Sequence, residues 1–589
     1  MCGVFFCARH GKDDTFPLLD LCERLKHANG ARGPDSQSTR RISVTGSELN
    51  HAAVVLDLFT SELRLRGSTP IVQPHEQDGN VFCWNGEIFD GMEIAKEEND
   101  GVKLFRALSA LDTAEQVCDL FGSIEGPYAF VYYHAASQRV FFARDPLGRR
   151  SLLIHEPSVG NPYFLLASVS VGSDPSCEFQ ELSTEYIYCL DLRNLGSGDN
   201  VCDCLGMFAA HDIIHQITST FGSSVSRFPR SSAVGALYSQ LSRVNTALPP
   251  DDWPVITGLE TPEYLTQAVE ELVAHLDRSV ELRVRDIPQS LLSAGTPRVA
   301  VLFSGGIDCT TLAFLAHKHI PLDEPIDLLN VAFENPRKVK LQAVVNPSNS
   351  RKKPPKPAPN PPPLYMVPDR ITGLQQVEEL RRLCPRVWNF VEVNVPYEES
   401  QAALPVIESL MFPARTVMDL SLGLALYFAS RGKGQVRAHP GAEPIPYTSP
   451  ARVLLNGLGS DELLGGYGRH RTAYDTGGME GRLILSQLQL EIDRIPSRNL
   501  GRDDRVVSSH GKEMRHPFLS LTVVSFLARL PVHLKMDPRA ETGLGDKMLL
   551  RLAARRMGLV EASSRKKRAM QFGSHSARME GEKRGDISI

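Results

Sequence analysis

The sequence predicts two successive folded domains, an antiparallel α+β sandwich followed by an α/β domain built on a parallel sheet. Three observations lead to this prediction. About the first 190 residues contain many short strand patterns separated by turn signals. Beyond residue 298 a strand, a helix and a second strand follow one another, as in a parallel sheet. The chain has 589 residues, of which 42% are hydrophobic and 23% charged, so it can bury large cores.

The first domain is expected over residues 2–190 as a layered α+β structure. Its strand-like segments are short and rich in apolar residues, and they are Met1–Phe6, Val54–Phe59, Val81–Asn85, Tyr128–Tyr133, Val140–Ala143 and Tyr163–Ser168. Two helical patterns, Leu18–His27 and Val102–Leu111, interrupt them. This mixture favours a packed antiparallel sandwich. Residues 191–260 are richer in Ser, Gly and Pro, and we expect them to connect the domains with some local structure, such as Val234–Leu241.

The second domain is expected over residues 261–575. Thr261-Pro262-Glu263 predicts a helix start, with Thr261 as N-cap and Pro262 at the first helical position. The elements expected after it are the strands Arg298–Phe303, Leu328–Phe333 and Arg452–Asn456 and the helices Thr310–His319, Gly373–Arg382 and Val417–Ser430. About the last 130 residues read as mostly helical, and 576–589 form a tail.

Residues 344–363 interrupt the second domain with eight Pro and several Lys and Arg. This composition cannot form a packed core, so it predicts an exposed, extended insertion whose role the sequence does not reveal.

Charge and cysteine content exclude several classes of protein. The net charge of −5 argues against a nucleic-acid-binding surface over the whole molecule, although a local basic pocket remains open. The 11 Cys are scattered and include no CxxC pair, so neither a disulfide framework nor a structural zinc site is expected. The sequence contains no apolar run of about 18 residues and no signal peptide. We therefore expect no membrane partner and a cytosolic or nuclear chain, with the cytoplasmic location preferred.

Cys2 is the first candidate for chemistry, because removal of Met1 would leave a thiol and an α-amine on one residue. An amine can act as base for an adjacent nucleophile, whereas the simpler alternative is a buried thiol in the first strand. Asn85-Gly86-Glu87 follows a strand, and an Asn amide with a Gly N–H can stabilise an oxyanion. Asn-Gly is also a common hairpin turn.

Four segments in this part of the chain resemble the class II glutamine amidotransferases, whose glutaminase domain has an N-terminal-nucleophile fold: MCGVFF, Arg32–Asp35, Trp84–Phe89 and Arg144–Gly148. The resemblance implies that Cys2 forms a γ-glutamyl thioester and that Asn85 and Gly86 form the oxyanion hole. It also implies that glutamine is bound by Arg66 at its α-carboxylate, by Asp100 at its α-ammonium and by Asn85, Gly86 and Glu87. Arg64 competes with Arg66 for the carboxylate, and either could be a solvated surface charge.

A second candidate site begins at Ser304-Gly305-Gly306-Ile307-Asp308-Cys309, between a buried strand and a helix. Two Gly residues let backbone N–H groups face a phosphate, and the helix N-terminus adds partial positive charge. The alternative is an ordinary strand-to-helix turn. A kinase-type P-loop is excluded because no Gly-Lys-Ser/Thr follows. A dinucleotide fingerprint fails at Gly457–Gly459, because Glu462 occupies the third glycine position.

The Ser304–Asp308 loop resembles the pyrophosphate loop of ATP pyrophosphatases, and Leu454–Glu462, Gly465–Tyr467, Glu513–Leu519 and Gly545–Lys547 resemble later signatures of asparagine synthetases. The resemblance implies binding of Mg²⁺ by Asp308 and Asp461, and charge neutralisation by Lys547. It implies an ATP and pyrophosphate site made of Ser304, Gly305, Gly306, Asp308, Cys309, Val331, Asn456, Gly457 and Lys547. Asp369 is a further candidate, with helix N-capping as its alternative. Lys566 and Lys567 could reach phosphate or be a solvated basic run.

Together the two halves resemble the glutamine-hydrolysing asparagine synthetases. The resemblance implies an enzyme that takes ammonia from glutamine, activates aspartate with ATP and Mg²⁺, and forms asparagine. Two departures matter. Leu458 stands where the family has an acidic residue associated with acyl transfer, and Cys309 replaces a hydroxyl residue. Two alternatives therefore remain: a glutaminase whose synthetase half is degenerate or uses another acceptor, and a non-catalytic nucleotide- or glutamine-sensing protein. The expected partners are small-molecule substrates and not nucleic acid, and the oligomeric state stays open.

Overall fold

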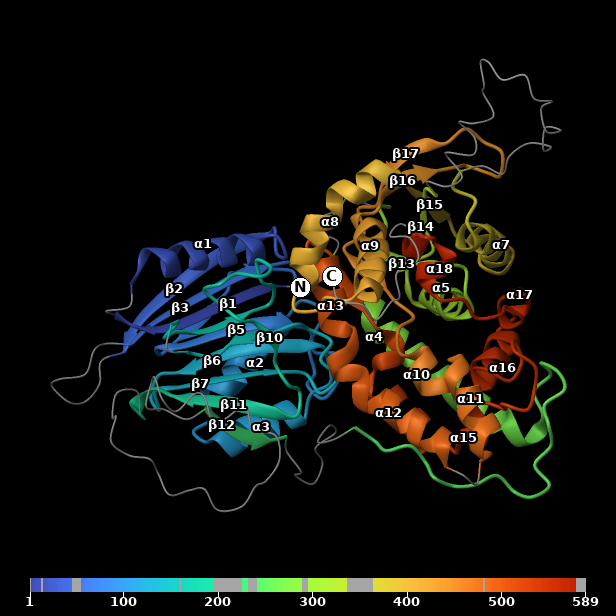
Figure 1. Cartoon of the computed structure of the whole chain (residues 1–589), viewed down its shortest axis with the longest axis horizontal. Helices are drawn as coiled ribbons and strands as arrows, with labels where there is room; N and C mark the ends of the chain where they lie inside the picture. The colour runs from blue at the N-terminus through green and yellow to red at the C-terminus, as the bar shows by residue number, and fades with distance from the viewer. Residues whose placement is uncertain are drawn as a thin grey trace, which may run out of the picture.

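The computed structural model describes residues 2–11, 14–44, 54–158, 160–194, 225–230, 241–288, 295–335, 364–479 and 482–578. Within these residues a β-rich part and an α/β part lie side by side (Figure 1). The expected insertion 344–363, residues 234–240 and most of the expected tail 576–589 lie outside the described residues.

Two antiparallel six-stranded sheets form the first part, in the orders β10-β8-β9-β1-β3-β2 and β12-β11-β7-β6-β5-β4. Their strands are β1 (Gly3–His10), β2 (Ser36–Val44), β3 (Val54–Glu62), β4 (His75–Gln77), β5 (Asn80–Gly86), β6 (Tyr128–His134), β7 (Arg139–Arg144), β8 (Leu153–His155), β9 (Phe164–Ala167), β10 (Gln180–Glu181), β11 (Tyr186–Asp191) and β12 (Val225–Pro229). β12 lies inside the expected connecting segment, where it pairs with β11 at the edge of the second sheet.

Alternation along β1 explains why both faces of the first sheet are covered. Val4 and Phe6 face the apolar layer between the two sheets, whereas Phe5 and Cys7 face helix α1 (Phe16–Gly30) on the outside. The helices α2 (Asp100–Ser109) and α3 (Ala114–Gly122) cover the second sheet in the same way. The predicted α+β sandwich of the N-terminal-nucleophile type is therefore confirmed.

A seven-stranded sheet in the order β17-β16-β15-β14-β13-β18-β19 organises the second part. Its strands are β13 (Val299–Leu302), β14 (Ile326–Phe333), β15 (Trp388–Val395), β16 (Lys433–Val436), β17 (Ile445–Thr448), β18 (Val453–Leu455) and β19 (Glu513–Arg515). The predicted parallel pairing is confirmed for five neighbouring strands of this sheet, β15, β14, β13, β18 and β19. β16 and β17 are antiparallel because they form a hairpin at the edge, so the sheet is mixed.

Helices cover both faces of this sheet and make up most of the chain after β18 (Figure 1). They are α4 (Thr266–Val284), α5 (Ile307–His319), α7 (Pro368–Leu383), α8 (Tyr397–Met411), α9 (Val417–Arg431), α10 (Ser460–Leu464), α11 (Gly468–Gly477), α12 (Leu483–Arg498), α13 (Leu500–Ser508), α14 (Leu521–Arg529), α15 (Val532–Lys535), α16 (Met548–Arg556), α17 (Val560–Ser563) and α18 (Met570–Gly573). The short 3₁₀ helices are Leu192–Asn194, Glu263–Leu265, Pro517–Leu519 and Ser576–Arg578. No helix in the described residues is long and apolar enough to cross a lipid bilayer.

Three predicted helix starts in the second domain differ from the structure, and one of them is that of α5, which begins at Ile307 rather than at Thr310. Thr261 does not cap a helix, because the 3₁₀ turn Glu263–Leu265 intervenes and α4 begins only at Thr266. α7 begins at Pro368 rather than at Gly373. Gly373 lies inside α7 because a Cβ there would come within 2.8 Å of Asn330 Nδ2, so close packing overrides the low helix propensity of glycine.

The interface between the two parts contains buried ion pairs. Arg32 Nη2 lies 2.7 Å from Asp504 Oδ2, and Arg150 Nη2 lies 2.8 Å from Glu513 Oε2, with all four side chains buried. A buried charge is stable only when paired. The two parts are therefore held at a fixed distance and orientation.

We expect Asp504→Asn to lower the free energy of unfolding by about 3–5 kcal/mol, because it removes a buried carboxylate that lies beside the buried guanidinium groups of Arg32 and Arg150. Urea unfolding measures this loss. The matched control is Glu270→Gln, which breaks an exposed ion pair with Arg556 whose two side chains are 52% and 47% exposed. The control should change stability by less than about 1 kcal/mol. Equal losses in the two variants would contradict the role given to the interface.

Candidate active sites

The first site is built around Cys2, which directly precedes β1 and is 6% exposed. Its backbone nitrogen donates a hydrogen bond to Asn85 Oδ1 at 3.0 Å, which joins the start of one sheet to the end of β5 in the other. Burial raises the pKa of the Cys2 thiol to about 11. The thiol is therefore protonated at neutral pH and needs a base before it can attack.

Asn85 presents a free donor beside this thiol. Its Oδ1 is held by the Cys2 nitrogen, while its Nδ2 is buried and makes no hydrogen bond within the described residues. A buried donor without a partner costs about 1–3 kcal/mol. Gly86 follows, and a Cβ there would come within 2.7 Å of both the Trp84 ring and Tyr128 Cβ, so the position admits only glycine. This arrangement suits an oxyanion that would accept from Asn85 Nδ2.

Arg66, Glu87 and Asp100 also converge on this end of the sandwich. Arg66 is 9% exposed, lies 3.4 Å from Glu87 Oε2 through its Nε, and donates to the Ile88 carbonyl at 3.2 Å. Asp100 accepts from the backbone N–H of Ile88 at 2.9 Å. Burial raises the pKa of Asp100 and raises that of Glu87 to about 7. A cation and an acid thus lie close together in low dielectric, which suits a zwitterion.

Arg64 is directed elsewhere. Its guanidinium lies 3.6 Å from Glu62 and donates to the Ile71 carbonyl at 3.4 Å. The geometry therefore favours Arg66 over Arg64 as the residue beside Glu87.

A cavity of about 350 Å³ opens next to Arg66, between the loop after β5 and the end of α4. Asp286 of the second domain lies 3.5 Å from Arg66 Nη1 in this cavity. Gln73, which the sequence analysis also missed, donates to Cys2 Sγ at 3.6 Å and accepts from the Trp84 backbone N–H at 2.9 Å. Neither residue belongs to a motif, so no local signal could have identified it.

The second site begins where β13 turns into α5. Gly305 has φ +77°, and a Cβ there would lie 2.5 Å from the backbone nitrogen of Gly373. Gly457, after β18, packs so closely that a Cβ would lie 2.7 Å from Asp308 Cβ. The Cys309 thiol donates to the Gly306 carbonyl at 3.2 Å. Sequence-distant loops thus meet at the carboxyl ends of adjacent parallel strands, where α/β proteins commonly bind ligands.

Two carboxylates in this site converge on one ammonium. Lys547 Nζ lies 2.9 and 2.8 Å from the two oxygens of Asp308 and 2.8 Å from Asp461 Oδ1. It also donates to Ser460 Oγ at 2.7 Å. Burial opposes ionisation of Asp461, but Lys547 and Lys567 hold its pKa below its ordinary value. Because the carboxylates already point at a cation, their donor set fits Mg²⁺, which binds one or two carboxylates together with phosphate oxygens.

Leu458 lies three residues before Asp461 in the chain and is partly buried. Its side chain is partly buried against the apolar core of the second domain, and it lines a cavity of about 10 Å³ with Leu500, Leu519 and Glu462. Glu462 accepts from Tyr467 Oη at 2.5 Å, and burial raises its pKa.

The remaining candidates lie around the same strand ends. Val331 is a buried strand residue, and Asn456 Oδ1 accepts from the Leu458 N–H at 3.1 Å. Asp369 does not cap α7, whose N-cap is Val367, so that alternative is wrong. Burial raises the pKa of Asp369 to about 7.

The two neighbouring lysines differ. Lys567 Nζ lies 3.1 Å from Asp461 Oδ2, whereas Lys566 is exposed.

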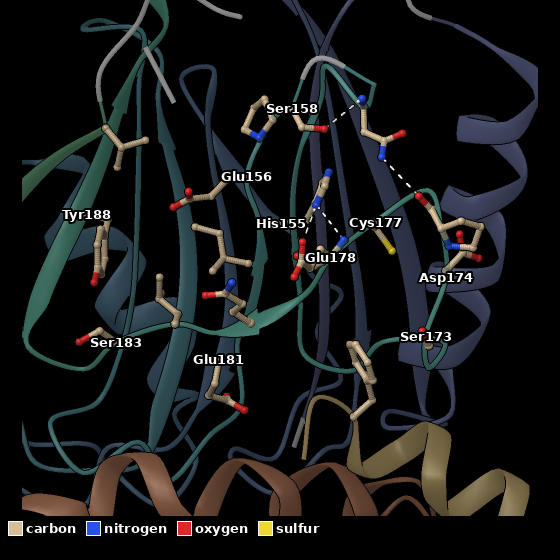
Figure 2. Close-up of a pocket in the computed structure, with 18 of the residues that line it drawn as sticks. His155, Glu156, Ser158, Ser173, Asp174, Cys177, Glu178, Glu181, Ser183 and Tyr188 are labelled. Atoms are coloured by element: carbon tan, nitrogen blue, oxygen red, sulfur yellow. Dashed lines mark hydrogen bonds between the residues drawn. The ribbon is translucent and has the colours of Figure 1, made fainter. Parts of the chain in front are cut away.

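A separate cavity of about 510 Å³ lies at the edges of the two sheets (Figure 2). His155 on its wall accepts from the Glu178 backbone N–H at 3.0 Å, and Glu156 and Tyr188 line it as well. None of the residues predicted for the two sites lines this cavity.

Comparisons with known proteins find two families along this chain. A family described as the glutamine amidotransferase domain matches residues 1–181, and a family described as asparagine synthase matches residues 480–586. Asparagine synthetase domain-containing protein 1 of Bos taurus is 37% identical, over 98% of this chain and 95% of that protein. The Homo sapiens protein of the same name is 36% identical over the same shares. An asparagine synthetase domain-containing protein of Saccharomyces cerevisiae is 31% identical, over 94% of this chain and 89% of its own.

We expect Lys547→Met to reverse the local pH dependence of stability. In the unsubstituted protein Lys547 helps hold the pKa of Asp461 below its value in the unfolded chain. The ionised Asp461 carboxylate therefore stabilises the fold at pH values above its unfolded-state pKa, and this stabilisation is lost as the pH falls through its folded-state pKa. Without the Lys547 ammonium, we expect burial and the neighbouring Asp308 to outweigh Lys567, which still lies 3.1 Å from Asp461, so the pKa of Asp461 rises above its unfolded value and its contribution to stability falls as pH rises. Relative to the unsubstituted protein, the variant should lose about 1–2 kcal/mol more stability near pH 8 than near pH 5.

Urea unfolding in magnesium-free buffer at the two pH values measures this difference. Lys566→Met removes the same charge from an exposed neighbour and serves as control. A pH-independent loss in Lys547→Met would show that the two carboxylates do not interact.

Proposed function

The chain belongs to the family of asparagine synthetase domain-containing proteins, and we propose that it is a glutamine-dependent amidotransferase. It joins a glutamine amidotransferase domain to an asparagine-synthase-like domain. The proposed reaction releases ammonia from glutamine, activates the side-chain carboxylate of aspartate with ATP, and forms asparagine, AMP and pyrophosphate. The observation that supports it most is the orientation of Asn85, whose Oδ1 accepts from the Cys2 nitrogen while its buried Nδ2 makes no hydrogen bond within the described residues.

The proposed glutaminase step starts with a free Cys2 α-amine. This amine takes the thiol proton, and Sγ attacks the carboxamide carbon of glutamine. The oxyanion of the tetrahedral intermediate accepts hydrogen bonds from Asn85 Nδ2 and the Gly86 N–H. The amine returns the proton to the leaving nitrogen, ammonia departs, and a γ-glutamyl thioester remains on Cys2. Water hydrolyses the thioester to glutamate.

Substrate orientation in this step is assigned to two charged residues. Arg66 would bind the α-carboxylate of glutamine and Asp100 the α-ammonium. Since burial raises the pKa of Asp100, a bound ammonium would favour the ionised form of this carboxyl group. Glu87, with Asn85 and Gly86, completes the set around the substrate.

The proposed synthetase step uses the loop Ser304–Gly306 for the pyrophosphate portion of ATP, through backbone N–H groups at the start of α5. Asp308 and Asp461 would bind Mg²⁺, which when bound offsets the charge on the phosphate oxygens. Lys547 would neutralise charge that develops on the same oxygens. Val331, Asn456, Gly457 and Cys309 would line the nucleotide site. Ammonia then displaces AMP from the acyl-adenylate.

Leu458 favours one second candidate, a glutaminase whose synthetase half has lost or changed its acceptor. An aliphatic side chain cannot take a proton or orient an amine, and here it packs into the apolar core. A purified sample incubated with glutamine, aspartate, ATP and Mg²⁺ separates the candidates by product mass. Asparagine with AMP supports the full reaction, glutamate alone supports the second candidate, and no turnover leaves the non-catalytic sensing protein.

We expect the active protein to begin at Cys2, because the proposed base is its free α-amine. Intact-mass analysis of active protein tests this, and a retained or acetylated Met1 would contradict the mechanism. Cys2→Ala should abolish glutamine hydrolysis. Any synthesis from added ammonia should persist, because the two sites are separate, and equal loss of both activities would argue against two sites.

We expect Leu458 to limit acyl transfer more than nucleotide binding. A missing general base costs about 10²–10⁴-fold in rate, whereas the loop Ser304–Gly306 and the pair Asp308 and Asp461 remain intact. The protein should therefore bind ATP with Mg²⁺ yet form asparagine slowly or not at all at saturating ammonia. Steady-state asparagine formation in the ordinary enzyme range of about 1–10³ per second would show that Leu458 is no handicap.

A further inference from the structure

A side chain of the second domain reaches the glutamine site of the first. Arg515, the last residue of β19, is 3% exposed and forms an ion pair with Glu87 through Nη2. Its Nε lies 2.6 Å from Glu513 Oε1, and its Nη1 donates to the Arg283 carbonyl at 2.6 Å. The guanidinium therefore has partners on three sides, and one of them belongs to the first domain.

The backbone of Arg515 is fixed by the central sheet of the second domain. β19 pairs in parallel with β18, and the Arg515 carbonyl accepts from the Asn456 N–H at 3.0 Å. The side chain extends from this anchor across the interface to Glu87. Its position does not depend on loops of the first domain.

Glu87 lies between two arginines. Arg515 contacts one carboxylate oxygen, and Arg66 Nε lies 3.4 Å from the other. Burial raises the pKa of Glu87 to about 7, while Arg515 and Arg66 favour its ionised form. Phe89 lies against both arginines, with their Cζ atoms 5.4 Å and 5.7 Å from its ring centroid, so both guanidinium groups have restricted room.

We propose that Arg515 is a positioning residue of the glutamine site: it holds the Glu87 carboxylate, which in turn fixes the guanidinium of Arg66 that receives the α-carboxylate of glutamine. This inference rests on the proposed function, because it takes Arg66 as the carboxylate-binding residue. It extends that proposal by making the glutamine site incomplete without the second domain. Arg515 acts through Glu87 and touches neither the thiol nor the substrate.

If Arg515 acts only by positioning Arg66, its substitution should weaken glutamine binding without slowing the chemical step at Cys2. Arg515→Gln in the full chain should raise the KM for glutamine by about 10- to 100-fold, the loss expected for a charge-assisted hydrogen bond. The kcat should stay within about threefold, because Cys2 and Asn85 are untouched. Arg515→Lys keeps a charge but not the three-sided contact, so it should show a smaller rise in KM.

The matched control is Arg452→Gln. Arg452 Nη1 lies 2.6 Å from Asp35 Oδ2 and so also joins the two domains, but it contacts neither Glu87 nor Arg66. Its substitution should leave the KM for glutamine unchanged. A rise equal to that of Arg515→Gln would show that any weakening of the interface produces the effect, and would overturn the proposal.

A double-mutant cycle tests whether Arg515 acts through Glu87. With Glu87→Gln already present, Arg515→Lys should raise the KM by less than about twofold further. Fully additive effects would overturn the proposal. Because this cycle uses the charge-conserving Arg515→Lys variant, it can be measured even if Arg515→Gln does not fold.

A probe that labels Cys2 distinguishes failure of the role proposed for Arg515 from failure of the proposed glutaminase function. 6-Diazo-5-oxo-L-norleucine has the α-ammonium and α-carboxylate of glutamine and alkylates a reactive thiol, so mass analysis of labelled Cys2 gives a half-saturating concentration. Arg515→Lys should raise this concentration in parallel with the KM. Unchanged values in a protein that hydrolyses glutamine would overturn the role of Arg515 alone. A protein whose Cys2 neither hydrolyses glutamine nor reacts with the probe would overturn both.

Discussion

The buried charges between the two domains are the constraint on which both sites depend. Burial disfavours ionisation of Glu513, yet Arg150 and Arg515 hold its pKa far below its ordinary value. Glu125 is held ionised in the same way by Arg149 and Arg283. Burying any one of these charged groups without a partner would cost free energy of folding. The pairing of these charges therefore favours the arrangement of the two domains in the structure, and this arrangement fixes the position of each site relative to the other.

The same constraint reaches the nucleophile. Arg32 donates through Nε to the Cys2 carbonyl at 3.3 Å, and through Nη2 it pairs with Asp504 of the second domain. Ser151 N–H donates to the same Asp504 oxygen at 3.1 Å. The first residue of a chain ordinarily frays, whereas Cys2 is held from the second domain through one arginine. The position of Cys2 thus depends on both domains.

Sequence reasoning succeeded where the signal was local. The apolar strand before Ser304 and the glycines after it predicted the loop that begins α5, and Gly305 indeed adopts φ +77°. The antiparallel hairpin β16–β17 was missed because its strands are short and contain little apolar periodicity. Asp286 and Arg515 were missed for another reason. They act on Arg66 and Glu87 across sequence separations of more than 200 residues, and nothing in their local sequence marks that contact.

The site around Cys2 and the site around Lys547 differ in how many of the residues required for their proposed reactions are present. In the first, the amide of Asn85 and the carboxyl group of Asp100 are buried and the guanidinium of Arg66 is nearly so, which is the set of groups that the proposed glutaminase step needs. In the second, Asp308, Asp461 and Lys547 lie together, whereas the partly buried Leu458 packs against the apolar core and lines a small cavity with Leu500 and Leu519. A carboxylate at position 458 would enter a cavity of about 10 Å³ that Glu462 already shares. Because two buried carboxylates repel each other, restoring the acid alone would cost stability before it could restore acyl transfer. The packing around Leu458, and not only its identity, therefore bears on whether an acid could act at this position.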